Sequence, residues 1–150
     1  MQHPSPVSYW RPTVGCKNPK CVLGKPIFLP YPNPPEISEG QPDWPKADWK
    51  AFVVCRWCEH GYEYTKRDVQ WGSSPSPGLP PHNAFLRVLL QCGHKNCDSL
   101  AIVHVAIDVS TTPQDRDRRI AKGCSNARCK EGHPPSLLPK ILSAEMENEI

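Results

Sequence analysis

Residues 53–61, with the sequence VVCRWCEHG, contain two cysteines separated by two residues at the end of a short apolar run. Three other stretches of the 150-residue chain are alike: 15–25 (GCKNPKCVLGK), 90–99 (LQCGHKNCDS) and 122–134 (KGCSNARCKEGHP). In each of these three, four residues separate the two cysteines, and no cysteine of the chain is left over. The resulting pairs are Cys16 with Cys21, Cys55 with Cys58, Cys92 with Cys97, and Cys124 with Cys129.

Close cysteine pairs favour metal binding over a disulfide framework. Two thiolates on one tight turn both reach a single Zn²⁺ at about 2.3 Å, and a second such turn completes a tetrahedron. The N-terminal residues MQHPSPVSYWRP lack the basic and apolar regions of a secretory signal, so we expect a cytoplasmic protein with reduced thiols. The eight cysteines therefore predict two structural zinc ions per chain, each held by four thiolates.

The composition indicates why such a chain needs metal. Proline accounts for 19 of the 150 residues, and hydrophobic residues make up 38%. Because proline neither continues a helix nor donates to a strand ladder, the fold should be loop-rich with a thin core. Structural zinc contributes roughly 10–16 kcal/mol of apparent folding free energy, enough to stabilise it. No apolar run approaches the ~20 residues of a membrane span, so we expect no membrane association.

Segments rich in β-branched and aromatic residues flank the second and third cysteine pairs. Residues 51–55 (AFVVC) and 62–65 (YEYT) surround the second pair, and 84–91 and 100–108 surround the third. These compositions predict two hairpins with a cysteine pair at the tip of each. The chain thus resembles zinc-ribbon and rubredoxin-type knuckle proteins over the cysteine pairs and the strands beside them, although C-x4-C departs from their commoner C-x2-C. The resemblance implies a small, loop-rich, mainly β metal-stabilised fold with two zinc ribbons in tandem.

The four cysteine pairs combine into two sites in three ways, and spacing alone leaves all three open. The segment 72–82 (GSSPSPGLPPH) is rich in proline, serine and glycine without periodicity, which is typical of a linker. A linker there favours consecutive pairing, with the first two cysteine pairs on one metal and the last two on the other. The expected organisation is a first ribbon over residues 1–72, a linker over 73–82 and a second ribbon over 83–150.

Two helices are expected in the second half of the chain. Residues 114–121 follow Pro113, with acidic residues in the first turn and basic residues later, as the helix dipole favours. Residues 136–148 are expected to form a short C-terminal helix, because apolar side chains recur on one side of a helical projection. Those side chains are Leu138, Ile141, Leu142 and Met146.

Closed metal sites favour a binding module, because catalytic zinc keeps an open coordination position. The sequence has neither H-E-x-x-H nor a glycine-rich phosphate loop. His60 and His133 are alternative ligands, but eight cysteines already complete two sites. The expected partner is a protein or a nucleic acid, and no small-molecule substrate is evident. A rubredoxin-like iron electron-transfer protein is the alternative, and a zinc enzyme is less favoured. The candidate contact residues are Trp57, Arg116, Arg118, Arg119, Lys122, Arg128 and Lys130.

Overall fold

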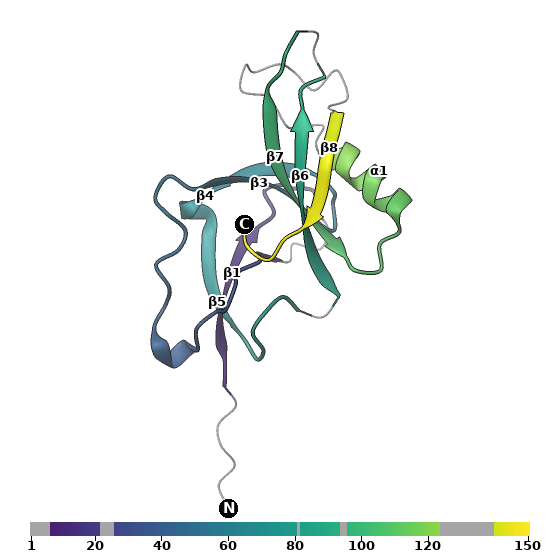
Figure 1. The fold of residues 1–150 in the computed structure, drawn as a ribbon. Helices are drawn as coiled ribbons and strands as arrows, with labels where there is room; N and C mark the ends of the chain where they lie inside the picture. Colours follow the sequence, from purple (N-terminus) through teal and green to yellow (C-terminus); the bar gives the residue numbers. More distant parts are fainter. Residues whose placement is uncertain (1–6, 22–25, 81, 94–95, 124–139) are drawn as a thin grey trace, which may run out of the picture.

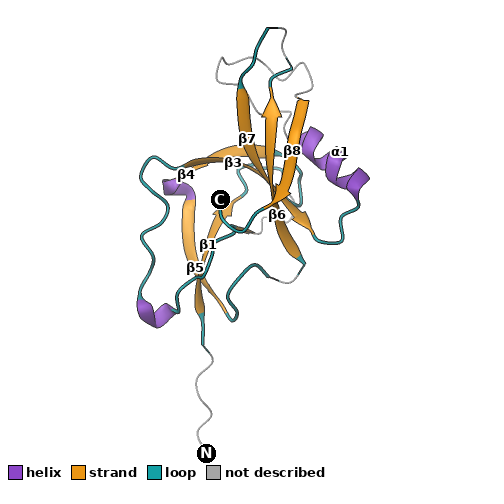
Figure 2. Cartoon of the chain, in the orientation of Figure 1, coloured by secondary structure: helices purple, strands orange, loops and turns teal. Residues whose placement is uncertain are grey.

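The computed structural model describes residues 7–21, 26–80, 82–93, 96–123 and 140–150 (Figure 1). Strands dominate this part of the chain, and they form two sheets accompanied by a single α-helix (Figure 2). The predicted mainly β fold is therefore confirmed. The strands are β1 (Tyr9–Gly15), β2 (Pro26–Phe28), β3 (Lys50–Val54), β4 (Gly61–Thr65), β5 (Val69–Ser74), β6 (Asn83–Gln91), β7 (Leu100–Asp108) and β8 (Lys140–Met146). The α-helix is α1 (Pro113–Gly123), and two 3-10 turns are η1 (Ile37–Glu39) and η2 (Lys66–Asp68).

The smaller sheet has three antiparallel strands in the order β2–β1–β5. Its central strand, β1, pairs with β5 from Tyr9 opposite Ser74 to Val14 opposite Val69. Side chains alternate between the two faces of a strand, and Val14 lies on the face that meets the core, where it is fully buried. Because β1 ends at Gly15, it places Cys16 at the edge of this core.

The larger sheet has five strands in the order β4–β3–β7–β6–β8. All neighbours are antiparallel except β3 and β7, which run parallel and align residues 52–54 with residues 103–105. Strands β3 and β4 precede the predicted linker 73–82, whereas β6, β7 and β8 follow it. One sheet thus joins strands from both predicted halves, and an arrangement of two zinc ribbons in tandem is not confirmed.

Both hairpins predicted around the second and third cysteine pairs are confirmed. Strands β3 and β4 occupy the predicted segments 51–55 and 62–65 to within one residue at each end. Strands β6 and β7 occupy 84–91 and 100–108 equally closely. Their β-branched and aromatic side chains pack well on a pleated, half-buried surface, which is the reason that composition located them.

Two groups of buried side chains cover the two faces of the larger sheet. On one face, Val54, Val103 and Val105 pack with Ile120 of α1. On the other face, Val53 and Phe85 join Val14 and the other buried residues of the smaller sheet. Complete burial of an aliphatic side chain of this size is worth about 1.5–3 kcal/mol. The larger sheet is therefore held between the helix and the smaller sheet.

The helix predicted over residues 114–121 is confirmed as α1, and it ends in close contact with the β3–β4 hairpin. A Cβ added to Gly61, the first residue of β4, would lie only 2.7 Å from the carbonyl oxygen of Gly123. A Cβ on Gly123 would lie 2.6 Å from Cγ2 of Val54. Glycine at these two positions lets the end of α1 approach the hairpin that carries Cys55 and Cys58.

The predicted C-terminal helix is wrong within the described residues. Residues 140–146 form β8, which pairs with β6 from Lys140 opposite Gln91 to Met146 opposite Leu86, with a β-bulge at Leu89/Leu90. The helical spacing of apolar residues was overridden by the backbone of β6, whose free edge offers hydrogen-bond partners to an extended chain. Residues 136–139 of that prediction lie outside the described residues. Ile141 and Met146 stay 41% and 64% exposed, as expected on an edge strand.

Candidate metal centre

Four cysteines from the first two pairs meet at one point. Cys16 and Cys21 follow β1, while Cys55 and Cys58 lie between β3 and β4. Their four sulfur atoms all lie within 4.8 Å of one another, and Sγ of Cys16 is 3.6 Å from Sγ of Cys58. Tetrahedral coordination with bonds of ~2.3 Å separates the sulfurs by roughly 3.8 Å. The four thiols are therefore close enough to share one metal ion, as consecutive pairing predicts.

Backbone hydrogen bonds shape both turns. In the first, the amide of Cys21 donates to the carbonyl of Asn18 at 3.0 Å, and the amide of Lys20 donates to the Asn18 side chain at 3.0 Å. In the second, the amide of Trp57 donates to Sγ of Cys55 at 3.4 Å, as is common at a thiolate that binds metal. Both turns thus present sulfur inward while their own backbone stays hydrogen-bonded.

The second turn closes through a residue in an unusual conformation. Glu59 has φ of +64°, and its amide donates to the carbonyl of Cys55 at 3.1 Å. The left-handed region usually favours glycine, so a glutamate here costs about 1–2 kcal/mol. The amide of Cys55 in turn donates to the carbonyl of His60 at 3.0 Å and continues the hairpin. The His60 ring contacts the carbonyl of Cys58 through Nδ1 at 3.0 Å, which gives it a structural role in this turn.

Lys17 ties the first turn to β4. Its amide donates to the hydroxyl of the fully buried Tyr64 at 3.2 Å, and its Nζ donates to the carbonyl of Glu63 at 2.7 Å. The same ammonium group forms an ion pair with Asp68 at 3.1 Å. These contacts join two segments that are 46 or more residues apart in sequence, so the two cysteine pairs are held together without relying on metal alone.

The surroundings shift the acidity of the thiols in opposite directions. Burial raises the pKa of Cys16, and it raises the pKa of Cys55 to about 11. Burial also opposes ionisation of Cys58, but hydrogen bonds from Asn18 and His60 outweigh it and lower the pKa of Cys58 to about 6. Because only thiolates bind metal, a metal ion must displace protons from Cys16 and Cys55 at neutral pH.

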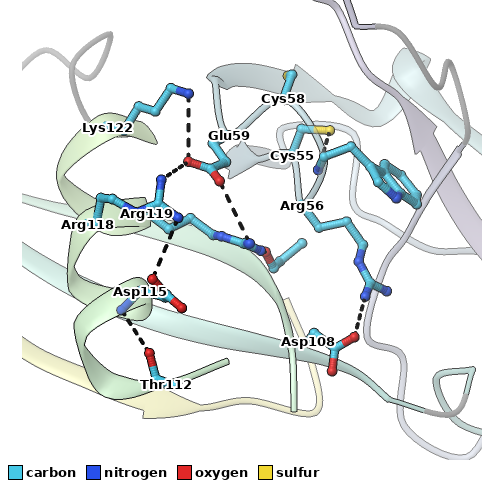
Figure 3. A network of polar contacts seen from close by, with 12 residues as sticks. Cys55, Arg56, Cys58, Glu59, Asp108, Thr112, Asp115, Arg118, Arg119 and Lys122 are labelled. Atoms are coloured by element: carbon cyan, nitrogen blue, oxygen red, sulfur yellow. Dashed lines mark hydrogen bonds and ion pairs between the residues drawn. The ribbon is translucent and has the colours of Figure 1, made fainter. Parts of the chain in front are cut away.

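Basic side chains of α1 converge on Glu59 beside the second cysteine pair (Figure 3). Arg118 Nη1 lies 3.0 Å from Glu59 Oε2, Arg119 Nη2 lies 3.8 Å from Oε1, and Lys122 Nζ lies 3.7 Å from Oε2. The Glu59 side chain is only 13% exposed. Three of the predicted contact residues thus neutralise a carboxylate of the same chain, which reduces the positive charge they offer to a partner.

The remaining predicted contact residues have different surroundings. Trp57 is half-buried against the core, with the guanidinium of Arg56 5.6 Å from its ring centroid. Arg116 forms an ion pair with the neighbouring Asp117 at 3.3 Å. A role for Trp57 or Arg116 in binding a partner stays a prediction. Arg128 and Lys130 lie outside the described residues.

The third cysteine pair lies at the tip of the β6–β7 hairpin, where the sequence predicts it. The amide of Cys92 donates to the carbonyl of Ser99 at 2.9 Å, and Cys97 is only 8% exposed. Cys124, Cys129 and His133 lie outside the described residues. Within the part of the chain that is described, the first centre is the one group of at least three cysteine, histidine or acidic side chains close enough to share a metal ion.

No protein-family model, curated protein or solved structure matches this chain. Among the described residues, no helix is long and apolar enough to cross a membrane. Sequence reasoning grouped the four cysteines of the first cluster but missed Lys17, Tyr64 and Glu59, whose contacts hold the two turns in place. The only signals were local: Lys17 lies inside the first turn, and Glu59 directly follows Cys58.

Proposed function

We propose that Cys16, Cys21, Cys55 and Cys58 bind one structural Zn²⁺. The observation that carries this proposal is the mutual proximity of four sulfur atoms on two tight turns. Four thiolates satisfy tetrahedral zinc completely and leave no open position for a substrate, which favours a structural role over a catalytic one. The ion would fix the β3–β4 hairpin against the end of β1.

We extend the proposal to a second zinc ion on Cys92, Cys97, Cys124 and Cys129. The support is the hairpin turn that brings Cys92 and Cys97 to one end of the larger sheet, together with the matching number of remaining cysteines. Eight cysteines grouped in metal-binding pairs suit a reducing compartment such as the cytoplasm. The described residues do not include the other two ligands, so this step rests on the sequence pattern.

The metal-stabilised fold is proposed to act as a module that binds protein or nucleic acid. Closed metal sites and a loop-rich surface support binding, because such sites stabilise a shape without supplying chemistry. The half-buried Trp57 and the exposed Arg118, whose side chain is 57% exposed, are the contact residues favoured by their positions. An iron site of the rubredoxin kind would use the same four sulfurs, so metal identity decides between binding and electron transfer.

Native mass spectrometry of the intact chain tests the metal assignment. We expect two zinc ions in the wild type and one in Cys58→Ser. The matched variant Cys92→Ser is also expected to keep one, and the double variant none. Loss of both ions in Cys58→Ser would contradict independent sites, and a mass two hydrogens short per cysteine pair would show disulfides. A coloured, iron-loaded protein would support electron transfer instead.

The binding role is tested separately with the zinc-loaded chain. Labelled single- and double-stranded DNA and RNA are titrated at about 0.1 M salt, where contacts to phosphates remain measurable. Nucleic-acid binding is expected to weaken severalfold in Arg118→Glu and to be unchanged in the control Arg67→Glu. No binding to any of the four probes would remove the nucleic-acid branch and leave a protein partner.

A further inference from the structure

A groove of about 840 Å³ opens on the larger sheet. Its lining comes from β3, β4, β6 and β7. The parallel pairing of β3 with β7 covers only residues 52–54 and 103–105, and the lining includes residues 50–51 and 101–102 just before it. The groove therefore occupies the wedge where the two strands have not yet joined. Its volume falls within the range of roughly 300–1,000 Å³ that is usual for small-molecule sites.

Apolar and aromatic side chains provide part of the groove wall. Tyr62 of β4 and Ile102 of β7 lie on the same face of the sheet as His104. Phe52 of β3 also lines the groove, but it packs with the buried side chains of the opposite face. Ile102, the third residue of the nine-residue strand β7, remains 41% exposed. The Tyr62 ring and the branched Ile102 side chain offer an apolar surface against which a planar group can pack.

Two cations line the same groove without a carboxylate partner among the described residues. Lys50 and Arg87 are both exposed, and neither forms an ion pair in that part of the chain. Glu63 is the acidic residue in the lining, and Glu145 lies opposite Arg87 on β8 without an ion pair joining them. The lining is thus more cationic than anionic, which complements an anion.

The polar side chains of Arg87 and His104 lie next to each other in the groove. They lie directly opposite each other in the β6–β7 pairing, so their side chains are neighbours on one face. Nδ1 of His104 lies 2.6 Å from Oε1 of Glu147, and these side chains are only 12% and 7% exposed. Because a carboxylate only accepts hydrogen bonds, Nδ1 donates to it. The His104 ring is thereby fixed, and its Nε2 is not engaged by Glu147.

We propose that this groove binds a small organic anion, with a planar apolar body against Tyr62 and Ile102 and the acidic group at Arg87 beside His104. Arginine suits this role because its planar fork matches carboxylate, sulfonate and phosphate groups. Lys50 lines the groove from the opposite face of the sheet, so Arg87 is the cation that meets the acidic group. The assignment goes beyond the proposed metal-stabilised module, and it does not depend on which metal occupies the cysteine cluster.

The probe for this proposal is 1-anilinonaphthalene-8-sulfonate, which combines a flat apolar body with a fixed negative charge. The metal-loaded full chain is titrated by fluorescence, and the same titration is followed by amide ¹H–¹⁵N chemical shifts. We expect one saturable site per chain and shifts concentrated at Tyr62, Ile102 and His104. The uncharged analogue N-phenyl-1-naphthylamine should bind at least tenfold more weakly.

Matched arginine variants separate the groove from general surface charge. Arg87→Gln should weaken binding of the sulfonate at least tenfold, while the exposed control Arg67→Gln should leave it unchanged. Ile102→Ser removes part of the apolar wall and should weaken both probes. Equal binding in the two arginine variants, equal binding of the two probes, or shifts centred elsewhere would overturn the proposal.

Metal content and cooperative thermal unfolding are recorded for every sample. A chain that binds no metal but still binds the sulfonate through Arg87 would contradict the proposed metal function and support the groove. A zinc-loaded, cooperatively folding chain that fails to bind the sulfonate would support the proposed metal function and overturn the groove proposal.

Discussion

Replacing Glu59 tests how the metal centre and α1 are joined. Glu59→Gln keeps the length of the side chain and removes the charge that Arg118, Arg119 and Lys122 share. Glu59→Gly removes the same charge but also relieves a backbone with φ of +64°. Both variants keep the amide that donates to the Cys55 carbonyl, so the turn itself retains its hydrogen bond.

The expected loss of unfolding free energy in Glu59→Gln follows from the burial of the side chains and the distances between them. A pair of unit charges about 4 Å apart near a protein surface attracts by roughly 4 kcal/mol before desolvation is subtracted. Arg118 and Lys122 are 57% and 49% exposed, so solvent screens their contributions, whereas Arg119 is 14% exposed. A hydrogen bond to a charged group nets about 1.5–3 kcal/mol. We therefore expect Glu59→Gln to lower the free energy of unfolding by about 2 kcal/mol.

Glu59→Gly should lose less stability than Glu59→Gln. Relief of the left-handed conformation returns about 1 kcal/mol, so Glu59→Gly is expected to be destabilised by only about 1 kcal/mol relative to wild type. The assay is urea unfolding of each variant at one fixed free zinc concentration, because zinc bound by the folded chain would add to the measured free energy of unfolding. Adding Arg119→Gln to each variant completes a double-mutant cycle that isolates the Glu59–Arg119 coupling.

Glu63→Gln is the matched control, since Glu63 is an exposed acid on the adjacent strand without an ion pair in the described residues. Its change in unfolding free energy should stay within about 0.5 kcal/mol. A loss below about 0.5 kcal/mol in Glu59→Gln would refute the link between the centre and α1. A glycine variant that is less stable than the glutamine variant would refute the argument from backbone strain.

Three further predictions concern packing, pH and a buried charge. Gly61→Ala should lower the free energy of unfolding by about 1–3 kcal/mol, because there is no room for the added Cβ. In the control Gly72→Ala the added Cβ has no atom within 4 Å, so thermal melting of this variant should match wild type. Burial of Asp68 is outweighed by hydrogen bonds from the Thr65 amide and from Lys17, which lower its pKa, so its stabilisation should be complete above about pH 3.9 and vanish as the pH falls through the folded value. The stability gap between wild type and Asp68→Asn in urea titrations should narrow over that window, and a constant gap would contradict it. Arg11 is 1% exposed, and its Nε and Nη1 have no hydrogen-bond partner in the described structure, so Arg11→Met should be neutral or stabilising in the same titrations, and a loss above about 1 kcal/mol would count against this.

Local composition located most of the elements that the metal centre needs. The strands around Cys55 and Cys58 were predicted because Phe52, Val53 and Val54 favour extended structure wherever they pack. The grouping of the first two cysteine pairs followed from the stoichiometry of tetrahedral zinc and the place of the linker. These inferences depend on residues that are close together in the chain, so the sequence alone is enough to draw them.

The pairing of strands that are far apart in the sequence could not be predicted from local composition. The parallel alignment of β3 with β7 depends on which edges remain free after each hairpin forms, and no residue of either strand encodes its partner. The same limit applies to residues 140–146, whose apolar spacing suits a helix but whose backbone pairs with β6. Glu59 was missed because its partners on α1 lie 59 or more residues later in the chain.

The parallel pairing of β3 with β7 has a consequence for biosynthesis. Arg56 and Asp108, which form an ion pair at 3.1 Å across this junction, are 52 residues apart. At a synthesis rate of about 5–20 residues per second, β7 emerges from the ribosome several seconds after β3, and β3 lacks this partner strand until then. All four cysteines of the first centre are synthesised before that interval ends, since Cys16 and Cys58 are 42 residues apart and both precede β7. A metal ion captured by the nascent chain would hold the β3–β4 hairpin in shape while its exposed edge waits for β7, and would protect that edge from pairing with other chains.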